Sequence, residues 1–267
     1  MQTLVKNKSG FTLIELLMAM VTGIIVLAGI YAAFNSQQKI HTKESQVVDA
    51  EQNVRGAAHF MVREIRLAGM DQTGNANARF RIAGPHSIRF TLDRNDDEDV
   101  LDADEDIAYR FSAAVDTDGN GFADSGAAPI ARVTTGEDRL AEDIHAIGFA
   151  YAFDRVIPGG SDGDGVLDFV DGDGDDVLDA GEEIWAYDSD GDGDLDWDND
   201  TNASLGFTVN FDRIRAVRVW ILARTRQPLR GSSGPKNFIV GDKPVNVNDN
   251  FKYRLLTTTV KCRNLGI

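Results

Sequence analysis

Lys8-Ser9-Gly10-Phe11-Thr12-Leu13-Ile14-Glu15 opens an apolar run that continues to Phe34. Within that run the only charged side chain is Glu15. At about 1.5 Å per residue, a helix over 11–34 is long enough to span a bilayer. A carboxylate in such a helix costs about 2.5–3.5 kcal/mol on insertion, so Glu15 needs a partner or a function.

The residues before the apolar run form a short basic leader. Lys6 and Lys8 favour a cytoplasmic N-terminus by the positive-inside bias. A secretory signal has its small-residue cleavage site after the apolar region, whereas Gly10 precedes it. Cleavage after Gly10 would therefore leave the hydrophobic helix on the mature chain. The plain alternative is a signal anchor that carries an incidental Glu.

The placement of Gly10, Phe11 and Glu15 resembles the processing site of type IV prepilins and pseudopilins. This resemblance implies that a prepilin peptidase cleaves between Gly10 and Phe11 and methylates the amino group of Phe11. It also implies that Glu15 pairs with that amine on a neighbouring subunit and fixes the axial register of a filament. The protein would be a single-pass inner-membrane protein with a cytoplasmic N-terminus, later found in the pilus, the periplasm or at the cell surface.

The helical pattern continues beyond the membrane-length segment. No proline interrupts 11–69, and Gly69 is a plausible stop. Apolar residues recur at helical spacing through its second half, namely Val47, Ala50, Val54, Ala57, Met61, Ile65 and Ala68. We therefore expect a leader over 1–10, one long helix over 11–69 with 11–34 in the membrane, and a periplasmic or extracellular domain over 70–267.

Strand signals dominate after Asp71. The expected strands are 87–92, 106–111, 146–153, 214–223 and 253–261, and the first two flank an acidic connection like a hairpin. The expected fold is α+β and pilin-like, with the long N-terminal helix packed on an antiparallel sheet. The lone Cys262 lies in an apolar, Thr-rich run and is read as a buried strand residue.

Three segments indicate one particular family of pilin-like proteins. Residues 62–70, 214–219 and 258–265 resemble the PilW family of minor pilins. This implies a non-enzymatic subunit that acts in type IV pilus assembly or initiation, with other pilins, minor pilins, the inner membrane and the assembly machinery as partners. Minor pseudopilins of type II secretion, such as the GspJ class, share the general layout and stay open as an alternative.

The net charge of −16 is local. Residues 160–200 carry 17 Asp and Glu and no Lys or Arg, which leaves 26 acidic against 27 basic residues elsewhere. Acidity concentrated in this way marks a site within the chain, and it argues against nucleic-acid binding, which needs a basic face.

Alternating carboxylates and glycines in this acidic insert predict Ca²⁺ loops. Positions 1, 3, 5, 9 and 12 of the best loop are Asp171, Asp173, Asp175, Asp179 and Glu182. A second candidate offers Asp188, Asp190, Asp192 and Asp196, but has Asn199 where the final Glu belongs. A third candidate, before the insert, offers Asp116, Asp118, Asn120 and Asp124. Many hard oxygen ligands on a flexible backbone suit Ca²⁺ better than Mg²⁺ or Zn²⁺.

Two further loops are incomplete. Asp162, Asp164 and Asp168 lack a first ligand, and the hairpin connection that ends at Glu105 has Arg94 where its first ligand should stand. The alternative for all of these is a solvated, disordered acidic stretch. Apolar residues interleaved with the acids, such as Leu195 and Trp197, favour folded loops. With Ca²⁺ bound, the insert would serve as a calcium-dependent tip adhesin or an assembly switch.

Overall fold

The computed structural model describes residues 10–154, 167–169, 182–229 and 231–265. The chain divides into two units, residues 1–46 and 47–267. Among the described residues, the first unit contains the start of the long helix, and the second contains the rest of the helix and the strands.

One continuous helix, α1 (Leu13–Ile65), crosses the boundary between the units. It ends four residues before the expected stop at Gly69, because the backbone after Ile65 changes from α-helical to 3₁₀-type hydrogen bonds. The backbone N–H groups of Leu67 and Ala68 donate to the carbonyls three residues earlier, at Glu64 and Ile65. The part of α1 that lies in the first unit exposes its large apolar side chains, whereas the buried residues of the helix begin at Ala50.

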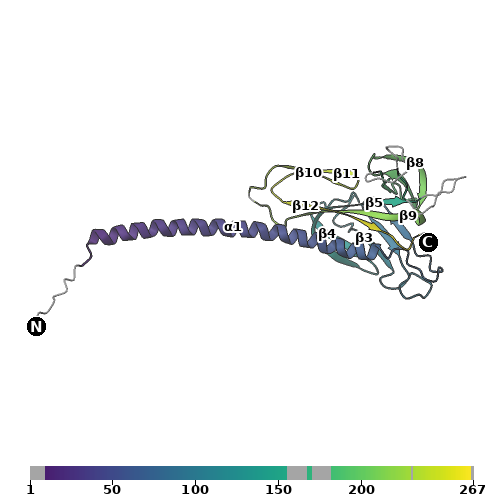
Figure 1. The fold of residues 1–267 in the computed structure, drawn as a ribbon, viewed down its shortest axis with the longest axis horizontal. Coiled ribbons are helices and arrows are strands. Elements are labelled where there is room, and N and C mark those ends of the chain that lie inside the picture. Colours follow the sequence, from purple (N-terminus) through teal and green to yellow (C-terminus); the bar gives the residue numbers. More distant parts are fainter. Residues whose placement is uncertain (1–9, 155–166, 170–181, 230, 266–267) are drawn as a thin grey trace, which may run out of the picture. The chain divides into compact units, whose positions relative to one another are not determined.

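The second part of α1 packs against the sheet along the stripe that the sequence predicts. Val54, Ala57, Met61 and Ile65 are buried there, and Ala68 is buried just beyond the helix. These residues join a core with side chains from the sheet, including Phe80, Phe90, Tyr109 and Tyr151. In Figure 1 the strands lie alongside this part of α1.

The strands form one large antiparallel sheet and one separate hairpin. The sheet contains β1 (Phe80–Ala83), β2 (Ile88–Thr91), β3 (Asp106–Phe111), β4 (Ala128–Val133), β5 (Glu137–Phe153), β6 (Ala186–Tyr187), β7 (Asp194–Asp198), β8 (Ala203–Asn210), β9 (Ile214–Arg224) and β12 (Tyr253–Lys261). The hairpin is β10 (Pro235–Val240) with β11 (Lys243–Asn248), and a short 3₁₀ turn, Phe211–Arg213, precedes β9.

The 17-residue strand β5 organises the sheet. It pairs with β4 near its start, with β9 from Ile144 to Phe153, and with β6 at Tyr151. The predicted hairpin of β2 and β3 is confirmed, and β12 pairs with β9 over the whole predicted range 253–261. An antiparallel sheet on a long N-terminal helix is therefore the observed fold.

The other face of the sheet carries a second, smaller core. Ala146, Ala150 and Ala152 of β5 are buried on this face, and their small side chains let the β10–β11 hairpin approach closely. A Cβ on Gly148 would lie 2.9 Å from the backbone nitrogen of Gly241, in the turn of that hairpin. The sheet is thus covered by α1 on one face and in part by the hairpin on the other.

Candidate functional site: an N-terminal processing motif and acidic loops

The predicted processing site lies where the helix begins. Gly10 and Phe11 are exposed, Phe11 to 90%, and they precede the first residue of α1. Glu15 turns back toward this end, because its carboxylate accepts from the backbone N–H and the hydroxyl of Thr12, both at 2.9 Å. The Thr12 hydroxyl accepts from the Glu15 N–H at 3.4 Å, which completes a capping box. The carboxylate is therefore held at the N–H of Thr12, one peptide bond after the bond that the motif predicts to be cut.

Among the described residues, α1 is the helix that is long and apolar enough to cross a membrane. Its mean hydropathy reaches 2.4 over 18 residues, and that window is not buried within the chain. The exposed side chains include Ile14, Leu17, Ile24 and Phe34. Such a surface needs lipid or other apolar helices to cover it.

The Asp116 loop has its carboxylates gathered at one point. Carboxylate oxygens of Asp116, Asp118 and Asp124 all lie within 4.8 Å of one another, a group that can hold a metal ion. Asp116 is buried, and its carboxylate accepts hydrogen bonds from the N–H groups of Asn120 and Gly121 at 3.0 Å each. Burial raises the pKa of the Asp116 carboxyl, and these two N–H groups oppose that shift.

The Asp188 loop also gathers three carboxylates, at its first, third and fifth positions. Oxygens of Asp188, Asp190 and Asp192 lie within 4.8 Å of one another, and Asp188 accepts the N–H groups of Gly191 and Gly193 at 2.6 and 3.3 Å. Asp196 is outside this group, and its carboxylate accepts hydrogen bonds from the N–H and the hydroxyl of Ser189 at 2.9 and 2.8 Å. Asp124 makes the same two bonds to Thr117 in the other loop, at 3.1 and 2.9 Å.

Asn199, at the twelfth position of the Asp188 loop, lies outside the carboxylate group. Its backbone N–H donates to the carbonyl of Trp185 at 2.7 Å, on the strand side of the loop. Burial, with the charges of Asp192 and Asp188 adding to it, raises the pKa of the neighbouring Asp194. A cation would relieve this repulsion among the carboxylates.

The hairpin connection holds a third loop of the same form, and its predicted register was wrong. The first position is Asp93 rather than Arg94, and its buried carboxylate accepts the N–H groups of Asp96 and Glu98 at 2.7 and 3.2 Å. Buried Glu105 closes the loop by accepting the N–H of Arg94 at 2.9 Å. The alternating residues Asp93, Asn95 and Asp97 mark the start of this loop in the sequence. The prediction placed the start at Arg94 because it took Glu105 as the twelfth residue of the loop, whereas Glu105 is the thirteenth.

In this third loop, oxygens of Asp97, Asp99 and Glu105 lie within 4.8 Å of one another. In the predicted loop over 171–182, Asp171, Asp173, Asp175 and Asp179 lie outside the described residues, as do Asp162 and Asp164 of the incomplete loop before it. The last residue of the 171–182 loop, Glu182, is described and partly buried.

A buried ion pair connects α1 with the sheet and the third loop. The Arg132 guanidinium donates to both oxygens of Glu64 at 3.0 Å and to Asp104 at 2.8 Å. The hydroxyl of Tyr109 donates to the same Glu64 carboxylate. Glu64 is 4% exposed, so the charge on the helix is neutralised inside the core. The apolar stripe of α1 gave no indication of this charge.

The turn of the β10–β11 hairpin lies between the Asp116 loop and the Asp188 loop. Lys243 donates to the backbone carbonyl of Asn120 in the Asp116 loop at 3.2 Å. Asp242 is 3.5 Å from the hydroxyl of Tyr187, the residue before Asp188, and 3.8 Å from Nε2 of His86. Burial, followed by the positive charge of Lys243, lowers the pKa of His86 to about 4.

The class of protein is defined by these features together. An N-terminal methylation motif matches residues 5–31, and it opens a long apolar helix whose second part packs on an antiparallel sheet. These are the features of a type IV pilin-like protein.

The particular family follows from the rest of the domain. The family model described as Type IV Pilus-assembly protein W matches residues 125–264, and the chain belongs to this PilW family. Among solved structures, the chain is similar to the type IV-like pilin TTHA1219 from Thermus thermophilus, with a TM-score of 0.43 and 12% identity over 81% of this chain and 98% of that one. No curated protein matches the sequence.

Proposed function

We propose that this protein is a minor pilin that acts in the assembly or initiation of a type IV pilus and performs no chemistry itself. Membership of the PilW family, with the N-terminal methylation motif ahead of a membrane-length helix, is the observation that carries this proposal. The N-terminus would face the cytoplasm until the peptidase has acted. The domain over 70–267 would face the periplasm and then join the filament with other pilins.

The first step of this proposal is processing between Gly10 and Phe11. Mass spectrometry of the membrane-extracted protein should show a chain that starts at N-methylated Phe11. Gly10→Leu should abolish the cut, because a bulky residue replaces the small one at the cleavage site, whereas Ser9→Ala should leave it unchanged. An intact Met1, or a cut beyond residue 30, in the wild-type chain would refute the processing step.

We also propose that the Asp116 and Asp188 loops bind Ca²⁺ and stabilise the domain. The Asp116 and Asp188 loops support this because each gathers three carboxylates. In both loops the first carboxylate accepts hydrogen bonds from two backbone N–H groups of the loop, and the ninth accepts from the second residue. Oxygen-only donors on glycine-containing loops fit Ca²⁺ in particular. Bound Ca²⁺ would stabilise the fold by mass action, about 2.7 kcal/mol at one hundred times Kd.

Calorimetry with the mature chain in detergent tests the metal proposal. Asp116→Asn and Asp188→Asn should each lower the Ca²⁺ stoichiometry by one and reduce the rise in Tm. Asp138→Asn, an exposed carboxylate on β5, is the matched control and should bind as the wild type does. No heat and no rise in Tm on adding Ca²⁺ to the wild type would refute this proposal.

The same variants separate the uses that bound Ca²⁺ would have. If both loops bind Ca²⁺ and their loss abolishes piliation, the ions act in assembly. If piliation persists and binding of cells to surfaces is lost, the domain is a calcium-dependent tip adhesin. If neither changes, the ions are local stabilisers of the fold.

A further inference from the structure

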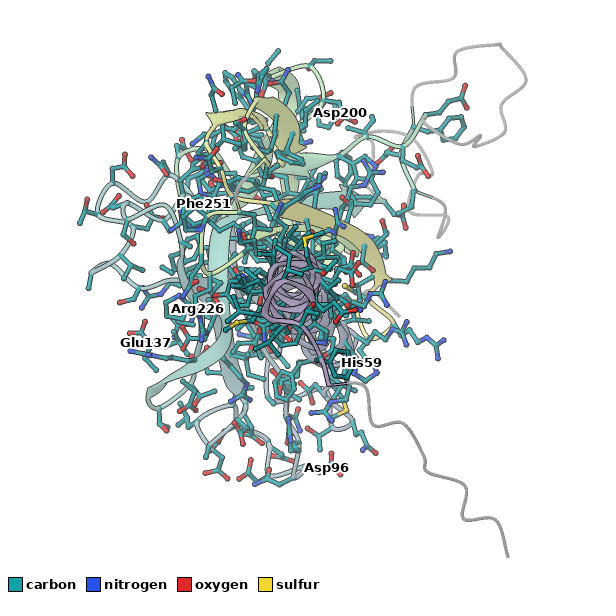
Figure 2. The ribbon with its side chains drawn as sticks, turned by 90° about the vertical axis from the view of Figure 1, so that its left-hand side faces the viewer. His59, Asp96, Glu137, Asp200, Arg226 and Phe251 are labelled. Atoms are coloured by element: carbon teal, nitrogen blue, oxygen red, sulfur yellow. The ribbon has the colours of Figure 1, made fainter. Side chains whose placement is uncertain are left out.

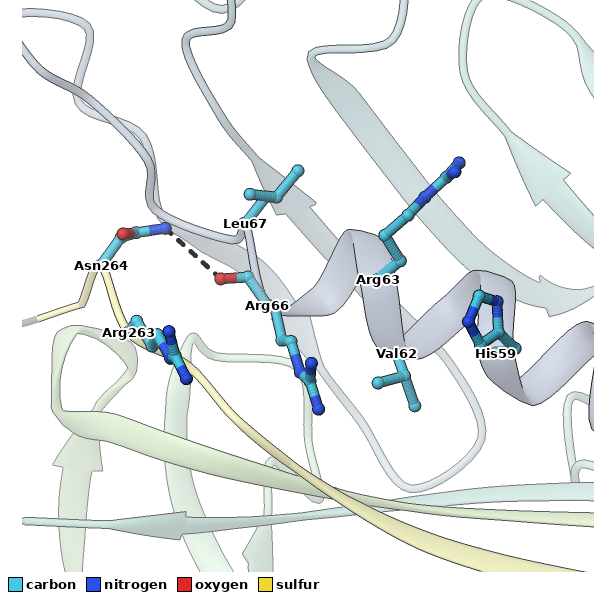
Figure 3. Close-up of a pocket in the computed structure, with 7 residues that line it drawn as sticks. All are labelled: His59, Val62, Arg63, Arg66, Leu67, Arg263 and Asn264. Carbon is cyan, nitrogen blue, oxygen red and sulfur yellow. Dashed lines mark hydrogen bonds between the residues drawn. The ribbon is translucent and has the colours of Figure 1, made fainter.

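The end of α1 and the last strand enclose a basic groove made of two adjoining hollows. The first, of about 490 Å³, is lined by His59, Val62, Arg63, Arg66, Leu67, Arg263 and Asn264. The second, of about 420 Å³, shares Arg66 and Arg263 and adds Leu167, Arg215, Ala216, Thr259, Lys261 and Cys262. Figure 3 shows the first hollow, where the Asn264 amide donates to the Arg66 carbonyl at 3.4 Å.

No carboxylate lines either hollow within the part of the chain that the structure describes. Arg66, Lys261 and Arg263 are exposed, and Arg63 is exposed beside the ring of Phe60. Arg215 differs from these residues because it is partly buried and forms an ion pair with Asp154 at 3.8 Å. In a chain of net charge −16, converging cations of this kind form a positive site that attracts an anionic partner.

The walls of the groove are partly apolar, which favours an acidic peptide over a free phosphate. Val62 and Leu67 line the first hollow, and Leu167 and Ala216 line the second. A peptide that carries both carboxylates and an exposed apolar side chain would cover these walls and pair with the arginines. A phosphate would use the charges alone.

The chain itself displays such a peptide. Asp96, Asp97, Glu98 and Asp102 are exposed on the third acidic loop, and Leu101 between them is 82% exposed. The buried Asp93 carboxylate holds the loop backbone at Asp96 and Glu98, so its shape is set before binding. Figure 2 labels Asp96 on this loop and His59, which lines the first hollow, on α1.

We propose that the basic groove of one subunit binds the acidic loop 96–102 of a second copy of the chain. Because the groove and the loop consist of different residues, the contact is heterologous and leaves one of each free for a further subunit. Each exposed ion pair is weak and screened by salt, so the contact depends on several charges acting together with Leu101.

Disulfide capture in the full mature chain tests this contact directly. One chain carries His59→Cys and the other Leu101→Cys, both in a Cys262→Ser background, mixed in detergent with a chelator and a mild oxidant. We expect at least tenfold more cross-linked dimer than with Ile239→Cys, an equally exposed apolar position on β10, in place of Leu101→Cys. A yield no higher than with Ile239→Cys overturns the proposal.

Charge exchange supplies a second test, with unchanged melting curves as the control for folding. Arg66→Glu with Arg263→Glu should reduce capture at least fivefold when it is carried by both chains, and so should Asp96→Lys with Glu98→Lys. Placing the first pair on the His59→Cys chain and the second pair on the Leu101→Cys chain should restore capture. Failure of this restoration overturns the proposal, as does capture that the reversals leave unchanged while inorganic phosphate competes for the groove.

Discussion

Glu64 is the one charged residue that α1 contributes to the core, and it shows how much depends on a single contact. Its carboxylate is buried and receives the Arg132 guanidinium through two hydrogen bonds. The pair is a poor source of net stability, because both charges lose their hydration. Removing one partner is different, since it leaves the other charge buried and partly unpaired.

Glu64→Gln should therefore destabilise the chain by about 3 kcal/mol, as measured by chemical denaturation. Arg139→Gln is the matched control, because Arg139 is 76% exposed and its ion pair with Glu142 lies at the surface. That change should stay within about 0.5 kcal/mol. Equal effects of the two substitutions would show that the Glu64–Arg132 pair is not buried.

His86 gives the domain a pH dependence of known sign. Its folded pKa of about 4 lies below the ordinary value of 6.5, because burial and Lys243 disfavour the charged ring. As pH falls from 6.5 toward 4, the unfolded chain takes up a proton that the folded chain refuses. Stability should thus fall by about 2–3 kcal/mol over this window.

The check is denaturation at several pH values in the presence of a chelator. His86→Gln should remove this part of the slope, whereas His59→Gln, at an exposed position on α1, should keep it. If the His86→Gln and wild-type curves run parallel from pH 6.5 to 4, the folded pKa of His86 is not lowered.

At the scale of elements, the end of α1 depends on one glycine. Gly69 has φ +74°, and its N–H donates to the Thr91 carbonyl at 3.0 Å, which joins the turn after the helix to β2. A Cβ there would lie 2.4 Å from Cδ2 of Leu265, so the C-terminal segment packs against the glycine itself.

Gly69→Ala should cost about 2 kcal/mol or more by denaturation, from backbone strain together with this clash. Gly74 isolates the two causes, because it has the same φ of +74° and open space around it. Gly74→Ala should cost about 1 kcal/mol. A Gly69→Ala variant no less stable than Gly74→Ala would argue against close packing of Leu265.

The elements differ in how well the sequence predicted them. The stripe on α1 and the strand over 253–261 follow from local periodicity, and both agree with the structure. The Asp93 loop was mispredicted by one residue, because its final Glu stands one position later than in the assumed pattern. The helix stop was placed at Gly69 because a tightened last turn has no distinct sequence signal.

At the scale of the whole molecule, the unpredicted features are those that join distant segments. The burial of Glu64 depends on its ion pair with Arg132, and the basic groove needs Arg66 and Arg263 side by side. No local pattern reports such pairs. The processing motif, in contrast, could be read from the sequence because its elements are contiguous, and a methylation motif does match there.

We propose that this PilW-family chain serves a type IV pilus. Electron microscopy of a deletion strain, with secreted enzyme activity measured in the same cultures, tests it most directly. We predict that surface pili are lost while secretion is unchanged, and that the wild-type gene, but not a Glu15→Ala variant, restores them. Normal piliation with loss of enzyme secretion would contradict the claim and assign the chain to a type II secretion pseudopilus.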